Sequence, residues 1–233
     1  MAEKSWRIQG RSKAMKRTDV VLAVGMLAMG LLALVALAAT GSLDGFLSWV
    51  WARHHNELSW YVRPLFLLPF CYFAYRRSLT GILATLLIFP TSLFWFPAPE
   101  NPTPRVEEYL AWERHFLTEG SVAARVVFLL LVVAFFVALA TAFWKRSWLW
   151  GLAVLNAGTL LKVIWSVAFG GAVGWASLAP SLFTLAVTDA AILLAVSWLK
   201  RRRARQEDEA QDAAQDAELA QSTGAPDPSG SKT

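Results

Sequence analysis

The chain alternates between long apolar stretches and short polar segments. A helix needs about 20 apolar residues to cross a hydrocarbon layer about 30 Å thick. Six stretches approach or exceed that length, and the pattern predicts an all-α protein, a polytopic bundle of six transmembrane helices with short interfacial helices on one side. The predicted spans are Val20–Thr40, Leu58–Tyr75, Leu79–Phe96, Val122–Trp144, Trp148–Ala168 and Leu178–Leu199.

The first stretch follows basic residues, as the core of a secretory signal also does. Its apolar run is longer than the usual 7 to 15 residues of a signal core, so we expect a retained span. The ending Ala38-Ala39-Thr40-Gly41 leaves cleavage open. The second and third stretches contain Pro64, Pro69 and Pro90, which remove backbone donors and bend helices. Freed carbonyls in lipid need neighbouring helices, so a compact bundle is expected.

Charged residues divide between the segments that join the predicted spans. If the N-terminus is cytoplasmic, every inner segment is basic, as the positive-inside bias requires. Both termini are then cytoplasmic, and the protein is expected in the plasma (inner) membrane. The chain divides into a basic segment (1–18), a six-helix domain (19–200) and a basic, then acidic tail (201–233). The tail is expected to be largely disordered, although its first part can extend the sixth helix by a few turns.

Composition supports this class of protein. Of the 233 residues 56% are hydrophobic and 12 are Trp, more apolar mass than a soluble domain of this size needs. The net charge of +5 comes from small basic groups that flank the predicted spans. Contact with the lipid bilayer, and with anionic lipid headgroups at the cytoplasmic face, explains these groups better than nucleic acid does. The single cysteine, Cys71, excludes an intramolecular disulfide and a Cys-x-x-Cys motif.

Two outer segments are predicted to lie at the membrane surface. The first, 41–57, is rich in aromatic residues and ends with His54, His55, Asn56 and Glu57 at the mouth of the second span, where Asn56 can cap the helix. In the second, Thr103 and Pro104 start a short helix that runs to about Leu117. Its expected apolar face contains Val106, Tyr109, Leu110, Trp112, Phe116 and Leu117.

Glu113 falls on that apolar face, where an unpaired carboxylate costs several kcal/mol. Arg63 and Arg125 each lie about one turn inside the outer end of a span. We therefore expect Glu113 to contact one of these two arginines. The contact either pins the outer helix to the bundle or holds a carboxylate ready for protonation or ligand binding.

The outer segments also contain side chains that bind divalent metals such as zinc or iron. The candidates are His54, His55, Glu57, Glu108 and His115. Neighbouring His54 and His55 point in different directions, so at most one of them enters a common site easily. Ordinary polar residues at a membrane interface are the alternative explanation.

Lys162 and Asp189 are the ionisable residues farthest from the ends of their predicted spans. A charge at that depth costs about 2.5 to 3.5 kcal/mol and should face a partner inside the bundle. Counting about 1.5 Å per residue puts the two at depths that a lysine side chain can bridge, with Asn156 close to Asp189. We predict a Lys162–Asp189 pair that either fixes the packing of the last two helices or relays protons or ions.

The motifs of common enzyme classes are missing from the sequence: it contains no His-Glu-x-x-His, Walker loop, Gly-x-Ser-x-Gly or dinucleotide fingerprint. The preferred hypothesis is a non-enzymatic bundle, either a small carrier, a channel-like protein or an assembly factor, with a polar extracytoplasmic mouth. The alternative is a membrane-embedded hydrolase or transferase that acts on lipid with a metal or acid-base centre at the extracytoplasmic face. A third possibility is a subunit that docks on a protein partner through a Trp-rich surface.

Overall fold

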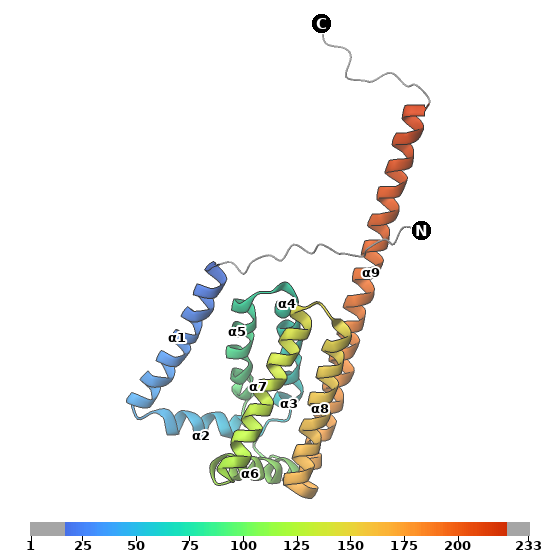
Figure 1. Cartoon of the computed structure of the whole chain (residues 1–233). Coiled ribbons are helices and arrows are strands. Elements are labelled where there is room, and N and C mark those ends of the chain that lie inside the picture. Colours follow the sequence, from blue (N-terminus) through green and yellow to red (C-terminus); the bar gives the residue numbers. More distant parts are fainter. Residues whose placement is uncertain (1–16, 223–233) are drawn as a thin grey trace. The chain divides into compact units, whose positions relative to one another are not determined.

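The computed structural model describes residues 17–222, with side chains to residue 219, and this part of the chain is helical with no strand (Figure 1), as predicted. Residues 1–16 and 223–233, which include most of the basic N-terminal segment and the end of the tail, lie outside the described residues. The elements are α1 (Arg17–Ala39), α2 (Leu43–His54), α3 (Leu58–Val62), η1 (Arg63–Phe66), α4 (Leu67–Arg76), α5 (Leu79–Ile88), η2 (Phe89–Phe94), α6 (Pro104–Thr118), α7 (Val122–Trp144), α8 (Trp148–Gly170), η3 (Gly171–Ser177) and α9 (Leu178–Ser222).

Within residues 17–222, three helical stretches are long and apolar enough to cross a membrane. They are α1, α7 and the continuous stretch Trp148–Leu219, which joins α8 to α9 through η3. Helix α7 has the bounds that the sequence predicted. Side chains on α1 and α7 are mostly exposed, as expected for helices that face hydrocarbon chains. The protein is therefore a membrane-associated helical protein.

The second and third predicted spans are not single α-helices. The second is divided into α3, η1 and α4, and the third into α5 and η2. Pro64 and Pro90 are the second residues of η1 and η2, and the missing N–H of each interrupts the α-helical hydrogen-bond ladder. The apolar segment is thus interrupted near one end, which leaves a shorter apolar helix, Leu79–Phe94, below the usual spanning length.

Helices α4–α5 and α7–α8 are joined by two turns of the same design. Arg77 and Arg146 have φ of 57° and 58°, the left-handed conformation that commonly ends a helix. In both turns the N–H of the next residue, Ser78 or Ser147, donates a hydrogen bond over 3.0 Å to a carbonyl of the preceding helix. The turns also contact each other, because Arg77 Nε donates to the Trp144 carbonyl over 3.1 Å and the Arg146 guanidinium lies 5.3 Å from the centre of the Tyr75 ring.

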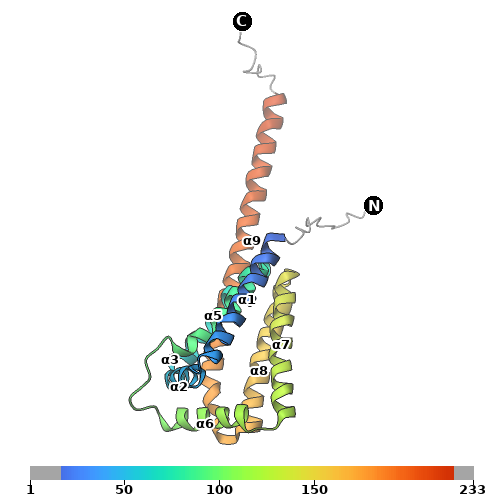
Figure 2. The same ribbon diagram turned by 90° about the vertical axis from the view of Figure 1, so that its left-hand side faces the viewer.

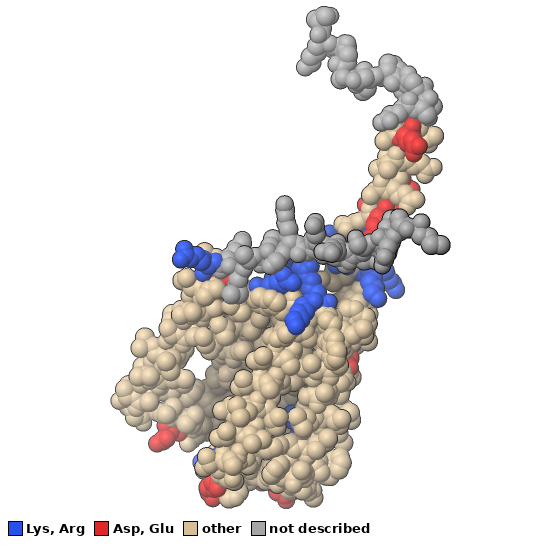
Figure 3. Space-filling model, viewed as in Figure 1, with Lys and Arg blue, Asp and Glu red and all other residues tan. Residues whose placement is uncertain are grey.

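Helix α1 is attached to the same end of the bundle by Asp19. Its carboxylate accepts hydrogen bonds from the Leu79 and Thr80 N–H groups, at 2.7 and 3.2 Å, and thereby caps the N-terminus of α5. Orphan N–H groups at a helix start favour such an anion. Basic side chains gather at this same end, where α1, α5 and α8 begin. Acidic side chains lie at the opposite end of the bundle (Figure 3).

Helix α6 covers that opposite end, across the ends of the long helices (Figure 2). It runs one residue beyond the predicted end, and its predicted apolar face is largely confirmed. Val106, Tyr109 and Leu110 are buried with Ala176 of η3 and pack against Trp51, Trp60, Trp112 and Val173. Gly174 permits this arrangement, because a Cβ there would collide with the backbone of Ser166.

The described residues form two compact units, and the boundary between them along the chain falls between Asp189 and Ala190. The functional site described below lies entirely in the first. In the second, α9 continues to Ser222, so residues 201–222 of the expected disordered tail are helical. Ala, Gln, Glu and Arg dominate this segment and have high helix propensity, which explains a helix much longer than a few turns.

Candidate functional site

The first unit contains a partly open cavity of about 450 Å³. Its wall is mostly aromatic and aliphatic, with α7 contributing the largest apolar face. Polar side chains are concentrated on the remaining wall, which α2, η1, α6, α8, η3 and the start of α9 provide. These polar residues are His54, Arg63, Tyr109, Glu113, Thr159, Lys162, Ser177, Ser181 and Thr184.

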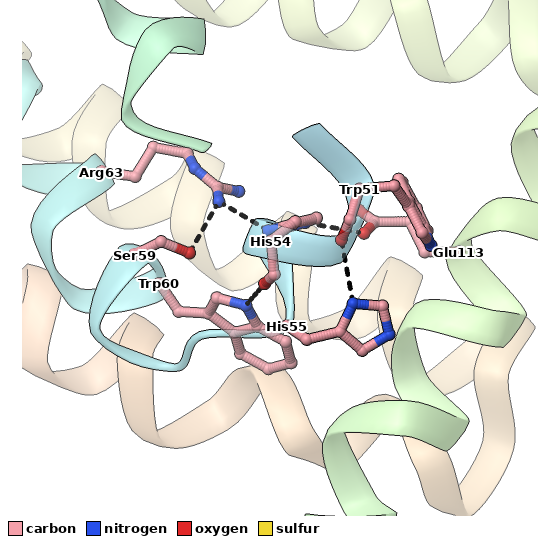
Figure 4. Close-up of polar contacts among 7 residues, drawn as sticks. All are labelled: Trp51, His54, His55, Ser59, Trp60, Arg63 and Glu113. Atoms are coloured by element: carbon pink, nitrogen blue, oxygen red, sulfur yellow. Dashed lines mark hydrogen bonds and ion pairs between the residues drawn. The ribbon is translucent and has the colours of Figure 1, made fainter. Parts of the chain in front are cut away.

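His54 lies at the centre of a polar array at one side of the cavity (Figure 4). Arg63 Nη2 lies 2.9 Å from His54 Nδ1, and His54 Nε2 lies 3.4 Å from Glu113 Oε2. The Arg63 guanidinium also donates to Ser59 Oγ over 3.3 Å, and Trp60 Nε1 donates to the His54 carbonyl over 3.1 Å. His54 is only 5% exposed, and both nitrogens of its imidazole ring contact protein side chains.

This geometry fixes the protonation of His54. An arginine guanidinium only donates, so Nδ1 must be the unprotonated acceptor, and Nε2 then carries the proton that it donates to Glu113. Burial lowers the pKa of the His54 imidazole below its ordinary value of 6.5, and the Arg63 charge lowers it further, against the opposing effect of Glu113. His54 is therefore a neutral bridge between a cation and a carboxylate.

Glu113 is ionised at this site. Burial alone would raise the pKa of its carboxyl, but the hydrogen bond and electrostatic interaction with His54, followed by the interactions with Arg63 and Lys162, outweigh burial and hold the pKa below its ordinary value of 4.5. Neighbouring Tyr109 remains a neutral phenol, because burial and the Glu113 charge raise its pKa to about 12. Lys162 interacts electrostatically with Glu113 and Arg63 across the cavity.

The direct contact expected between Glu113 and an arginine is replaced by this bridge. Arg63 reaches Glu113 through His54, whereas Arg125 donates to the carbonyls of Leu117 and Thr118, over 2.9 and 3.3 Å, at the end of α6. Sequence reasoning placed Glu113 correctly on the inner face but treated His54 as a surface residue. The sequence did contain one indication that His54 is buried: it lies at the C-terminal end of an aromatic-rich interfacial helix.

The predicted Lys162–Asp189 pair is not formed between these described residues. Asp189 Oδ2 instead accepts a hydrogen bond from Asn156 Nδ2 over 3.0 Å, and Asp189 Oδ1 has no hydrogen-bond partner. Lys162 faces the cavity with Glu113 and Arg63 as its charged neighbours. Depth along a helix was estimated adequately, but depth does not determine which side of α8 faces which neighbour.

The candidate metal ligands lie apart. His54 is committed to Arg63 and Glu113, His55 Nδ1 donates to the Trp51 carbonyl over 2.9 Å, and His115 pairs with exposed Glu119 over 3.1 Å. Glu57 accepts from Thr103 Oγ1 over 3.0 Å, and Glu108 is exposed. Among residues 17–222 no three His, Cys, Asp or Glu side chains gather as a metal site would require.

Two buried donors on the cavity wall have no hydrogen-bond partner among residues 17–219, whose side chains the structure describes. They are Arg63 Nε and Trp165 Nε1, and both residues line the cavity. A buried donor without a partner costs about 1 to 3 kcal/mol. The wall therefore offers unused donor capacity to whatever occupies the space.

The fold and the site together define a membrane-associated helical protein with a largely apolar internal cavity that carries a polar array of Arg63, His54, Glu113 and Lys162. Comparison of the chain with protein families, with curated proteins and with solved structures gives no match.

Proposed function

We propose that the chain crosses a plasma (inner) membrane six times with both termini in the cytoplasm, and that it is a small non-enzymatic carrier. The basic turns at Arg77 and Arg146 lie at one end of the bundle, and the His54–Glu113 array lies at the other. The positive-inside bias then supports an extracytoplasmic mouth. The interruption at Pro64 suits such a span, because Pro64 is half-buried and lines the cavity inside the bundle.

Cysteine labelling tests this orientation. In a Cys71→Ala background, His115→Cys should react in intact cells with a membrane-impermeant maleimide, because the His115 side chain is 66% exposed at the proposed outer end. Lys145→Cys, which is also exposed but lies at the basic end, should react only after permeabilisation. The opposite pattern, or equal labelling of both positions in intact cells, would reverse or refute the proposed topology.

The cavity is the observation that supports a carrier. Its volume of about 450 Å³ lies within the range of about 300 to 1,000 Å³ typical of small-molecule sites, which are apolar with a few placed polar groups. A ligand with an apolar body and one polar end matches this distribution. The basic end of the bundle suits contact with anionic headgroups of the inner leaflet.

A lipid-modifying enzyme is the second candidate, because a histidine oriented by a carboxylate is typical of acid-base centres. The array argues against that role. Both ring nitrogens of His54 are engaged, one by Arg63 and one by Glu113, so neither is free to accept a proton from a nucleophile or water. Ser59 Oγ, the hydroxyl next to the array, accepts a hydrogen bond from the Arg63 guanidinium, which cannot act as a base.

Occupancy of the cavity is tested by a matched pair of tryptophan variants on α7. Leu131 lines the cavity, whereas neighbouring Leu130 is 62% exposed and does not. Native mass spectrometry of purified protein should show a retained small amphiphile that Leu131→Trp displaces and Leu130→Trp does not. Equal retention in both variants, or no occupant in the wild-type protein, would count against a binding role for this space.

The exposed tryptophans are explained by contact with the membrane–water interface, and no protein partner is needed to account for them. Trp49, Trp95 and Trp175 are 44%, 50% and 50% exposed near the mouth, and Trp150 is 69% exposed near the basic end. Tryptophan is enriched at both membrane–water interfaces, where an indole ring reaches the headgroup level. We therefore assign these residues to the lipid interface.

A further inference from the structure

We infer that the cavity recognises the acidic head of a single-chain amphiphile, with the head at Arg63, Lys162 and Trp165 and the chain along α7. This inference rests on the proposed carrier function and names the ligand class. It combines the basic and acidic groups of the wall, its unused donors, and the size and polarity of the cavity.

Basic side chains outnumber carboxylates on the cavity wall. Arg63 and Lys162 are two basic groups, and Glu113 is the carboxylate among the lining residues of the described chain. His54 accepts from Arg63 and adds no second acid. An anionic ligand group beside Lys162 would stabilise its ammonium form in this largely apolar space.

The unused hydrogen-bonding groups also favour an anion. Arg63 Nε and Trp165 Nε1 are donors without partners, and the Lys162 ammonium adds further donors. The hydroxyls of Ser177, Ser181 and Thr184 donate to backbone carbonyls three or four residues earlier in the chain, over 2.9, 2.7 and 2.7 Å. A carboxylate or phosphate group supplies the acceptor oxygens that these donors lack.

The remaining wall suits one apolar chain. The side chains that α7 contributes are Phe128, Leu131, Val132, Phe135 and Phe136. On the α8 side, Gly158 lets the Phe135 ring approach the helix backbone, because a Cβ there would collide with that ring. A volume of about 450 Å³ accommodates a single chain with a small head rather than a whole two-chain lipid.

The test measures the preference of the purified full-length protein for charge on the ligand head. The probes are a fluorescent conjugated-polyene fatty acid and its methyl ester, which share a chain and differ in charge. The wild-type protein should bind the acid about tenfold more tightly than the ester, as expected for one charge-assisted contact in a partly desolvated site. Lys162→Met should lower affinity for the acid about tenfold and leave the ester unchanged.

Two further variants guard against trivial explanations. Lys145→Met removes a cation from the exposed turn after α7 and should change neither affinity. If Lys162→Met does not fold, Trp165→Phe removes one unpartnered donor while keeping an aromatic body, and it should reduce acid binding a few-fold without affecting the ester.

The outcomes separate the ligand class from the carrier function. Equal binding of acid and ester by the wild-type protein overturns the acidic-head assignment and leaves the carrier function standing, whereas binding of neither probe contradicts both. Competition then distinguishes the possible sources of the acidic group. Displacement by an alkyl carboxylate or an alkyl phosphate, but not by inorganic phosphate, supports a single-chain amphiphile. Equal displacement by inorganic phosphate overturns it.

Discussion

Replacing Glu113 by leucine should lower the free energy of unfolding by about 1 to 3 kcal/mol, the usual cost of leaving the partners of a removed group unsatisfied. The Glu113 side chain is 32% exposed, faces the basic groups of Arg63 and Lys162, and accepts the proton of the His54 ring. Leucine leaves all of these groups unsatisfied. The measurement is reversible unfolding in mixed micelles with a rising fraction of denaturing detergent.

The matched control for this prediction is Glu119→Gln. Glu119 belongs to the next turn and also contacts a histidine, His115, but both side chains are largely exposed, at 72% and 66%. An exposed pair contributes at most about 1 kcal/mol, so this variant should unfold like the wild-type protein. The double variant Glu113→Leu, Lys162→Met should recover part of the lost stability. A Glu113→Leu protein as stable as the control would contradict the array described here.

Stability should fall as the pH falls from 7.5 to 5, and His54 should be the cause. Its pKa in the folded protein lies below the unfolded value of 6.5. Below that value the unfolded chain binds a proton that the folded chain does not, which favours unfolding with a slope of at most about 1.4 kcal/mol per pH unit. Above pH 6.5 both states are neutral at this residue and the effect disappears.

Glu113 adds to the loss only at lower pH. Its carboxyl has a depressed pKa in the folded protein, so its contribution is present above the unfolded value of 4.5 and is lost below it. The range from 7.5 to 5 therefore reports on His54 alone of these two.

Two glutamine variants isolate this effect. His54→Gln retains an acceptor for Arg63 and a donor for Glu113 but does not titrate, so its stability should stay nearly constant across the range. His115→Gln, at an exposed position, should keep the wild-type pH dependence. Thermal unfolding in detergent at several pH values measures both. An unchanged slope in His54→Gln would show that another group is responsible.

Much of the fold follows from local patterns that the sequence carries openly. Thr103 and Pro104 determined the start of α6, and the apolar run 122–144 determined both ends of α7. The interruptions at Pro64 and Pro90 were anticipated as bends, but the change to 3-10 geometry that shortens the α-helices depends on neighbouring segments. Local patterns therefore predicted where the helical elements lie better than they predicted whether each element is a continuous α-helix.

The site was less predictable, because its contacts join residues that are distant in the chain. Periodicity showed that Glu113 faces inward, yet it gave no information on the orientation of His54, which depends on how α2 enters the bundle. The Lys162–Asp189 prediction failed for a related reason. Rise per residue gives depth, whereas the choice between Asn156, Asp189 and the cavity depends on the rotation of α8 about its axis.

The paired turns at Arg77 and Arg146 have a consequence for biosynthesis. A left-handed backbone costs a non-glycine residue about 1 to 2 kcal/mol, so glycine would be the less strained choice at both places. Arginine at these positions ends the helix and contacts the neighbouring turn. In the proposed orientation it also supplies the positive charge that keeps the segment from being translocated. Relaxing either bend by mutation would thus also weaken the cue that tells the insertion machinery which way the hairpin should face.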